Sequence, residues 1–293
     1  MLDAVKRAPL LQRVWWALQW RLRLVFWAAA GLPRRLAAWL AFHRNRSRYQ
    51  VIGEHELRQA RKSDTVFIFG SGYSLNDITP AEWRAIEAHD TVGFNWFVHQ
   101  QFVRCDFHMV REIGDDTDWR PQAAEYFGLI TSNPRFARTT FLVQTGFKAV
   151  NGNRAIGHSL LPDPNPVYLF RSYYSRMPSP SLAQGLVHTN GTVSDCVNFA
   201  ALLGWRTIVL CGVDLYDRRY FWLRADEPRH GDTTIQGHHN TVAGGAVSGG
   251  IVDSLAEWRR FYQQQGISLY AYNPRSLLID AMPVWEWPAG SLS

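Results

Sequence analysis

The sequence predicts an α/β fold in which helices alternate with the strands of a largely parallel sheet. From residue 49 onward, short apolar runs alternate with helical patterns, and this order is typical of parallel sheets with right-handed crossovers. The runs Thr65–Phe69 and Thr207–Cys211 are strongly apolar, as buried strands are. A glycine-containing turn directly follows each of these two runs.

The first half of the domain begins with the strand Thr65–Phe69, which leads into Gly70-Ser71-Gly72. A helix is expected to start at Thr79-Pro80-Ala81-Glu82, because Thr79 can cap it, Pro80 suits its first position and Glu82 completes a capping box. Further strands are expected at residues 91–94, Phe107–Val110, 141–143 and Val167–Phe170. Residues 171–187 are rich in Ser, Pro and Tyr and are expected to be irregular.

In the second half, Thr192–Leu203 reads as a helix that ends at Gly204, a favourable C-terminal cap. The strand Thr207–Cys211 follows, and then Gly212-Val213-Asp214-Leu215-Tyr216. Residues 217–250 are polar and end rich in glycine, so a mobile functional lid is expected there. A helix at 251–265 and a strand at 268–272 complete the domain.

Four unusual stretches are expected to meet in one crevice. Ligands of parallel sheets bind past the carboxyl ends of the strands. Gly70-Ser71-Gly72, Asn95 and Asp214-Leu215-Tyr216 follow predicted strands, and Asn190-Gly191 enters the helix at Thr192. The sequence therefore predicts a binding site at this edge, although a Gly-x-Gly after a strand is also common in plain turns.

The chain divides into a segment of residues 1–48 and a domain of residues 49–293. Residues 1–48 contain ten Lys or Arg, one acid and five of the thirteen tryptophans. Tryptophan and arginine together suit the bilayer interface, so we expect a helical segment that associates peripherally with a membrane. A helical hairpin packed on the domain or on a partner, and a signal peptide, are alternatives.

The remaining composition narrows the classes of function. Outside residues 1–48 acids outnumber bases, whereas a nucleic-acid groove needs basic residues among the folded elements, so we expect no nucleic-acid partner. Three widely spaced cysteines argue against a disulfide framework or a zinc site. Walker loops, nucleophile elbows and His-Glu-x-x-His are absent from the sequence.

Five stretches, in order, resemble the bacterial sialyltransferases of glycosyltransferase family 42. They are FGSGYSLNDI, VGFNWF, HTNGTVSDCVNFAALLGWRTIVLCGVDLY, IQGHHN and ISLYAYNPRSLL, between about residues 64 and 280. The resemblance implies a Rossmann-like single nucleotide-binding domain, a variant of the GT-A type. It implies an inverting, metal-independent glycosyltransferase that uses a CMP-sugar. Ser71 stands where the family has Asn, and Val187 where it has Arg.

The resemblance also implies roles for single residues. His238 matches the general base, with His239 as the rival, and Tyr216 and Tyr220 match the tyrosines that stabilise the departing phosphate. The implied donor-binding set is Gly70, Ser71, Gly72, Ser74, Asn95, Thr189, Asn190, Gly191, Gly212, Asp214 and His239. We expect Asp214 to support the turn that contains it rather than to take part in catalysis. We expect no cofactor, with the CMP-sugar as substrate.

The expected partners are a CMP-activated acidic sugar (sialic acid, Kdo or a related nonulosonic acid) and a glycan or glycolipid acceptor. The expected location is the cytoplasmic face of the bacterial inner membrane, and a homo-oligomer is compatible with the family. Two possible metal sites are less favoured than the metal-independent interpretation. One is Asp116-Thr117-Asp118, which fits a metal-binding Asp-x-Asp pattern, and the other is a cluster of His230, Asp232, His238 and His239. A magnesium-dependent diphosphate-transferring enzyme of similar fold and a non-catalytic membrane adaptor remain alternatives.

Overall fold

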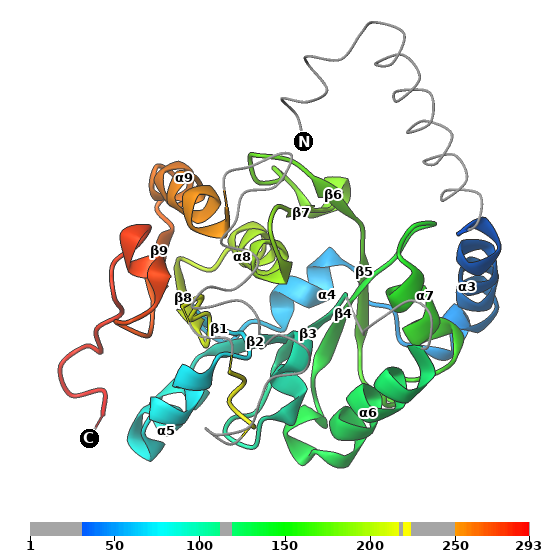
Figure 1. Cartoon of the computed structure of the whole chain (residues 1–293), viewed down its shortest axis with the longest axis horizontal. Helices are drawn as coiled ribbons and strands as arrows, with labels where there is room; N and C mark the ends of the chain where they lie inside the picture. The colour runs from blue at the N-terminus through cyan, green and yellow to red at the C-terminus, as the bar shows by residue number, and fades with distance from the viewer. Residues whose placement is uncertain (1–30, 112–118, 217–218, 224–249, 293) are drawn as a thin grey trace, which may run out of the picture.

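The computed structural model describes residues 31–111, 119–216, 219–223 and 250–292. Within these ranges seven strands form one sheet in the order β5-β4-β3-β2-β1-β8-β9, and every neighbouring pair is parallel (Figure 1). This confirms the predicted Rossmann-like α/β sheet. The strands are β1 (Thr65–Phe69), β2 (Asp90–Phe94), β3 (Phe107–Val110), β4 (Thr140–Gln144), β5 (Val167–Phe170), β8 (Thr207–Cys211) and β9 (Ser268–Ala271).

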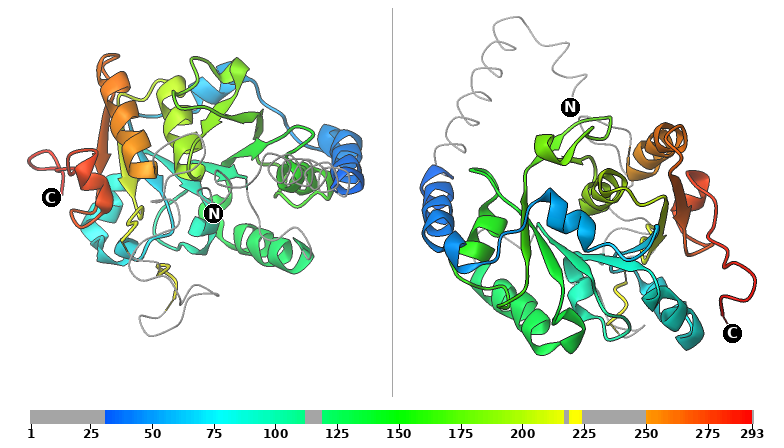
Figure 2. Two further views of the ribbon diagram at one scale, coloured as in Figure 1. Left: turned by 45° about the horizontal axis from the view of Figure 1, so that its top comes forward. Right: turned by 180° about the vertical axis from the view of Figure 1, so that it is seen from behind.

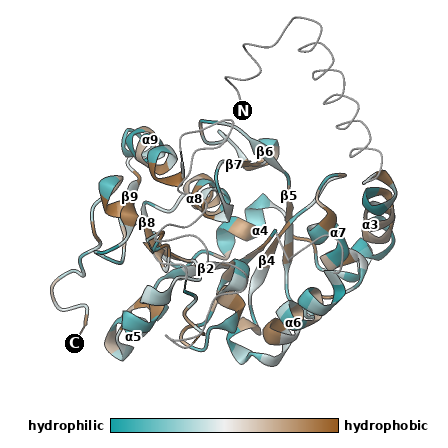
Figure 3. Ribbon diagram, in the orientation of Figure 1, coloured by the Kyte–Doolittle hydropathy of each residue, from teal (hydrophilic) through white to brown (hydrophobic). Residues whose placement is uncertain are grey.

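Helices cover both faces of the sheet (Figure 2). In β1, Val66 and Ile68 pack into one apolar cluster, and Phe67 and Phe69 pack into the other. This alternation follows from the two-residue period of a strand. Figure 3 shows that hydrophobic residues gather in the strands. The first cluster packs against α4 (Glu54–Gln59), α8 (Thr192–Leu203) and α9 (Ile251–Gln263), and the second against α5 (Pro80–Glu87), α6 (Trp119–Ser132) and α7 (Val150–Gly157).

The local sequence signals placed most elements to within two residues. β1, β3, β5, β8 and α8 have the predicted bounds. The Thr79 side chain accepts a hydrogen bond from the Glu82 N–H, and a Glu82 carboxylate oxygen accepts one from the Thr79 N–H, which confirms the capping box. Gly204 ends α8 at a φ of 100°, the left-handed conformation that glycine adopts at lowest cost.

The expectation that residues 171–187 are irregular is wrong in part. β6 (Ser172–Tyr174) and β7 (Leu186–His188) pair in parallel as a separate two-stranded sheet. Each strand has three residues, too few for an alternating pattern to stand out in the sequence. Their pairing places His188 next to the start of α8.

The described part of residues 1–48 begins with α3 (Leu32–Asn45), which carries Pro33 in its first turn. One face of α3 packs on α7: Ala38 and Phe42 are buried, and a Cβ on Gly157 would lie 2.7 Å from the Cβ of Ala41. Among the described residues, every helix is too short or too polar to cross a bilayer.

The three cysteines and His108 are among the ionisable side chains that lie buried in the fold. The cysteines Cys105, Cys196 and Cys211 are buried and unpaired, and burial raises the pKa of each thiol. His108 in β3 is fully buried, with its Nε2 2.7 Å from the hydroxyl of Tyr126. Burial lowers the pKa of His108 to about 3, so the imidazole stays neutral in the folded protein at neutral pH.

Candidate functional site

A pocket lies past the carboxyl ends of β1, β2 and β8. In the sheet order, β2 to β5 extend from one side of β1, while β8 and β9 extend from the other. The connections therefore diverge between β1 and β8, the place where open parallel sheets bind ligands. The pocket is lined by residues at the ends of these strands, of the loops after them and of the start of α8: Gly70, Ser71, Gly72, Phe94, Asn95, Trp96, Gly191, Thr192, Val193, Gly212, Val213, Asp214, Leu215 and Tyr220.

The predicted meeting of four strand-end stretches is thus confirmed, since each contributes at least one lining residue. Seven members of the predicted binding set line the pocket: Gly70, Ser71, Gly72, Asn95, Gly191, Gly212 and Asp214. Tyr220 also lines it. The predicted residues Ser74, Thr189, Asn190 and Tyr216 are close in sequence to lining residues but do not line the pocket themselves.

The glycines after β1 permit close packing against the loop after β8. The N–H of Gly70 donates to Cys211 O at 2.9 Å, and the N–H of Gly72 donates to Gly212 O at 2.8 Å. A Cβ would lie 2.5 Å from Gly212 O at position 70, and 2.7 Å from the same oxygen at position 72. Since these distances are too short for a carbon atom, packing of the two loops is sufficient to require glycine at both positions.

Asp214 joins the loops that follow three strands. Its carboxylate accepts hydrogen bonds from the Ser74 N–H at 2.9 Å, from the Ser74 hydroxyl and from Asn273 Nδ2 at 2.9 Å. Asp214 is 2% exposed, so these three donors compensate for the loss of hydration of its carboxylate. This geometry fits the supporting role expected for Asp214, and it makes Ser74 part of the same support.

Asn95 presents an unsatisfied polar atom at the pocket. It follows β2 with a φ of 50°, a left-handed conformation that asparagine tolerates better than most residues. Its Oδ1 is buried and lacks a hydrogen-bond partner among the described residues. An unpaired buried acceptor costs about 1–3 kcal/mol. A ligand that donates to this oxygen would recover that energy, which makes Asn95 a strong candidate for ligand binding.

The amino end of α8 forms a second polar part of the pocket. Gly191 caps the helix with a φ of 135° and without a side-chain hydrogen bond, and Gly191, Thr192 and Val193 line the pocket. The first N–H groups of a helix and its dipole favour anions. Nearby, Ser194 Oγ accepts from the Thr189 N–H at 3.0 Å and donates to Gly191 O at 2.7 Å, so the turn is held in place.

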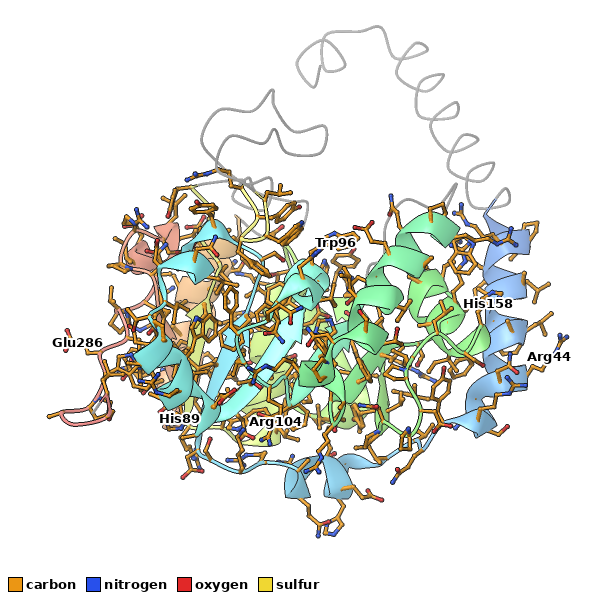
Figure 4. The ribbon with its side chains drawn as sticks, turned by 90° about the horizontal axis from the view of Figure 1, so that it is seen from below. Arg44, His89, Trp96, Arg104, His158 and Glu286 are labelled. Atoms are coloured by element: carbon orange, nitrogen blue, oxygen red, sulfur yellow. The ribbon has the colours of Figure 1, made fainter. Side chains whose placement is uncertain are left out.

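An aromatic wall stands beside these polar groups. The ring of Trp222 is stacked between Tyr220, with centroids 4.4 Å apart, and His99, at 4.1 Å. Trp96 lies 6.3 Å from Trp222, and both Trp96 and Tyr220 line the pocket. In Figure 4 Trp96 lies at the edge of the sheet opposite His89, which precedes β2. Stacked rings offer a flat surface for a base or the apolar face of a sugar.

Tyr216 does not line the pocket itself, but its N–H donates to Asp214 O at 2.8 Å. Its hydroxyl accepts a hydrogen bond from Asn273 Nδ2 at 3.3 Å. The phenolic proton of Tyr216 can therefore be donated elsewhere.

Several other predictions fall wholly or partly outside the described residues. The expected base His238 and its rival His239 lie outside them, as do Asp116-Thr117-Asp118 and the remaining members of the less favoured metal cluster, His230 and Asp232. Of the expected lid at 217–250, only residues 219–223 and 250 are described. In the described ranges, groups of three or more His, Cys, Asp or Glu side chains placed to hold a metal are absent.

A buried cluster of Arg111, His188 and Asp195 was missed by the sequence reasoning. His188 Nδ1 lies 2.6 Å from Asp195 Oδ2, His188 Nε2 lies 3.0 Å from Arg111 Nη1, and Arg111 Nε lies 3.8 Å from Asp195 Oδ2. Ser172 donates to Asp195 Oδ1 at 2.8 Å. Arg111 directly follows β3, so the strand-end rule that selected Asn95 could also have selected it.

β7, which precedes α8, carries both a core residue and a member of this cluster. Val187, which stands where the family of the resemblance has arginine, is fully buried in β7 and belongs to the apolar core, so its side chain cannot contribute to a polar site. Asp195 is fully buried in the first turn of α8. The contact between His188 and Asp195 therefore fixes β7 to the start of the helix that lines the pocket.

Comparison with known proteins yields no family assignment. The chain matches no family model, and no curated protein matches it. Among solved structures, it is similar to the Maf glycosyltransferase of Magnetospirillum magneticum AMB-1, with a TM-score of 0.47 and 18% identity over 80% of this chain. The chain spans only 35% of that protein's length.

Two sialyltransferases of Campylobacter jejuni are also similar. The monofunctional α-2,3-sialyltransferase Cst-I has a TM-score of 0.44 and 15% identity, over 80% of this chain and 82% of that one. The sialyltransferase CstII in complex with cytidine-5′-monophosphate has a TM-score of 0.41 and 16% identity, over 78% of this chain and 86% of that one. At these values, the function has to be argued from the chain's own residues.

Proposed function

We propose that this chain is an inverting, metal-independent glycosyltransferase. It transfers an acidic sugar (sialic acid, Kdo or a related nonulosonic acid) from a CMP-sugar to a bacterial surface glycan. The observation that carries the proposal is the composition of the pocket. A helix amino end, a buried amide oxygen without a partner and an aromatic surface face one crevice at the divergence point of the sheet.

These three features match the parts of a nucleotide-activated acidic sugar. The amino end of α8 at Gly191 suits the phosphate or the sugar carboxylate, because both are anions. The Oδ1 of Asn95 suits a donor group, such as a ribose hydroxyl or the amino group of cytosine. The ring of Tyr220, stacked on Trp222, offers a flat surface for the base or the sugar.

Cleavage of a CMP-sugar builds negative charge on the departing phosphate, and phenolic O–H groups can stabilise that charge. Tyr220 lines the pocket. The Tyr216 hydroxyl already accepts from Asn273, so its own proton can be donated to the phosphate. We assign these two tyrosines to this role. We assign His238 as the base that removes the proton of the acceptor hydroxyl, because a histidine titrates near neutrality.

The test is CMP release from CMP-sialic acid and from CMP-Kdo, measured in EDTA and again with magnesium. The wild type is compared with His238→Ala and Asn95→Ala, and with Arg84→Ala as the matched control, an exposed change on α5 outside the pocket. We expect release in EDTA from one of the two donors. Loss in His238→Ala, with wild-type rates in the control, supports the assignment of the base.

A direct binding measurement accompanies this assay, because hydrolysis without an acceptor can be slow. Calorimetry with CMP is expected to show binding to the wild type and weaker binding to Asn95→Ala. If the wild type neither binds CMP nor cleaves any CMP-sugar, the proposal is wrong. Magnesium-dependent conversion of ATP to AMP, without cleavage of either CMP-sugar, would point to diphosphate transfer, whereas the absence of nucleotide binding would favour a membrane adaptor.

A further inference from the structure

The outer face of α3 carries a stripe of exposed leucines. Leu32, Leu36 and Leu40 are 50%, 44% and 49% exposed, and they account for three of the nine large hydrophobic side chains exposed in the described residues. Their spacing of four residues places them on one side of the helix. Ala38 and Phe42, which pack toward α7, lie on the opposite side and are buried. Within the described ranges, the stripe is thus the face of α3 that other residues leave exposed.

Basic side chains lie at both ends of this stripe. Arg44, Arg46 and Arg48 are exposed just beyond its last leucine, and the half-buried Arg35 lies in the first turn of α3. In the sequence, Asp3 and Glu54 are the nearest acids on either side, so fifty consecutive residues, 4–53, carry no carboxylate side chain. A leucine face bordered by arginines is complementary to an anionic lipid surface.

We propose that the Leu32–Leu36–Leu40 stripe of α3 docks on the surface of an anionic bilayer. The helix lies in the interface, with its leucines among the acyl chains and its arginines at the headgroups. The sequence that precedes the stripe has the same character, with Trp15, Trp16, Trp20 and Trp27 among five basic residues. Trp39, half-buried beside the stripe, adds an aromatic ring of the kind enriched at bilayer interfaces.

A second copy of the chain fits this face less well. In a two-fold contact the same surface meets itself, so the stripe would place its arginines against the same arginines of the second copy. An anionic lipid surface instead supplies the missing negative charge.

The location of α3 relative to the pocket suits an enzyme with a lipid-linked acceptor. In Figure 4 α3 starts at the edge of the sheet where Trp96 lies, and Arg44, near its end, lies toward the opposite edge. Since Trp96 lines the pocket, the beginning of the stripe and the pocket are on the same edge of the molecule. The docking itself is independent of the proposed function, because it depends only on α3.

The experiment measures binding of the full chain to vesicles of phosphatidylcholine alone and of phosphatidylcholine mixed with phosphatidylglycerol. The test variant is Leu36→Ser with Leu40→Ser. The matched control is Ile279→Ser with Leu292→Ser, which removes two side chains of similar exposure, 46% and 43%, far from α3 in the sequence. Circular dichroism and thermal melting check that both variants keep their fold.

We expect the wild type and the control to bind the anionic vesicles, with binding that weakens as salt is added. The α3 variant is expected to bind about tenfold or more weakly, because two leucines no longer enter the interface. Equal binding by the α3 variant and the wild type would overturn the proposal. So would a wild type that ignores anionic vesicles, or a wild-type dimer that the α3 variant converts to a monomer without any change in lipid binding.

Discussion

Substituting Gly72 by alanine tests whether this glycine serves the packing of two loops or only the approach of a ligand. The backbone at Gly72 has a φ of −67° and a ψ of 155°, which any residue can adopt, so a new side chain causes no dihedral strain. Its Cβ would lie 2.7 Å from Gly212 O, about 1 Å closer than carbon atoms prefer. It would also press against the carboxylate of Asp214.

The expected loss of stability depends on which atoms a Cβ at position 72 would displace. Overpacking of a well-packed site costs about 1–3 kcal/mol. A shift of the Asp214 carboxylate would also weaken its hydrogen bonds to Ser74 and Asn273, and bonds to charged groups are worth about 1.5–3 kcal/mol each. Because the two effects overlap, we expect Gly72→Ala to lower the free energy of unfolding by about 2–4 kcal/mol.

The assay is urea unfolding followed by circular dichroism, with Gly128→Ala as the matched control. Gly128 lies in α6 and is exposed, and a Cβ there meets nothing within 4 Å. The same chemical change should therefore raise the stability by about 0.5–1 kcal/mol, through helix propensity alone. If Gly72→Ala unfolds at the same urea concentration as the wild type but no longer binds CMP, the packing argument is refuted. Close approach of a ligand would then remain as the reason for the glycine.

Three further outcomes are expected. Burial lowers the pKa of His108 from 6.5 to about 3, so the folded protein binds this proton less readily than the unfolded chain does. The contribution of His108 to stability is therefore complete above pH 6.5 and is lost as the pH falls toward 3. Urea unfolding should show a loss of up to about 1.4 kcal/mol per pH unit over this range, and His108→Asn should remove this pH dependence. Asp195→Asn should lower the unfolding free energy by about 3 kcal/mol or more, because it removes the buried charge that His188 contacts, whereas Asp64→Asn, at an ion pair with an 84% exposed carboxylate, should change it by less than about 1 kcal/mol; equal effects in a thermal melt would contradict this. Asn95→Ala should raise the Kd for CMP by about tenfold with little loss of stability, measured by calorimetry, and an unchanged Kd would exclude a contact between Asn95 and CMP.

The elements and their order could be predicted from the sequence because their signals are local. An apolar run of five residues, a Thr-Pro-Ala-Glu capping box or a glycine after the last helical residue acts within a few positions of itself. The meeting of Gly70, Asn95, Gly191 and Asp214 at one edge could also be predicted. Parallel strands bring their carboxyl ends to the same side, whatever the order of the strands in the sheet.

The contacts between distant segments were decided by the tertiary structure alone. Nothing local links Asp214 to Asn273, Arg111 to His188, or the glycines after β1 to the loop after β8. These contacts depend on which strands become neighbours in the sheet, and many strand orders are compatible with the same hydrophobic pattern.

Tertiary packing also decides which face of α3 is buried. The sequence identifies an apolar and basic helix, but only its packing on α7 determines which apolar residues are buried and which remain outside. Leu36 and Phe42 are both hydrophobic, yet one is 44% exposed and the other 6%. The chain by itself therefore determined its local elements and the edge that carries the site. The tertiary contacts decided which residues support that edge and which face the surroundings.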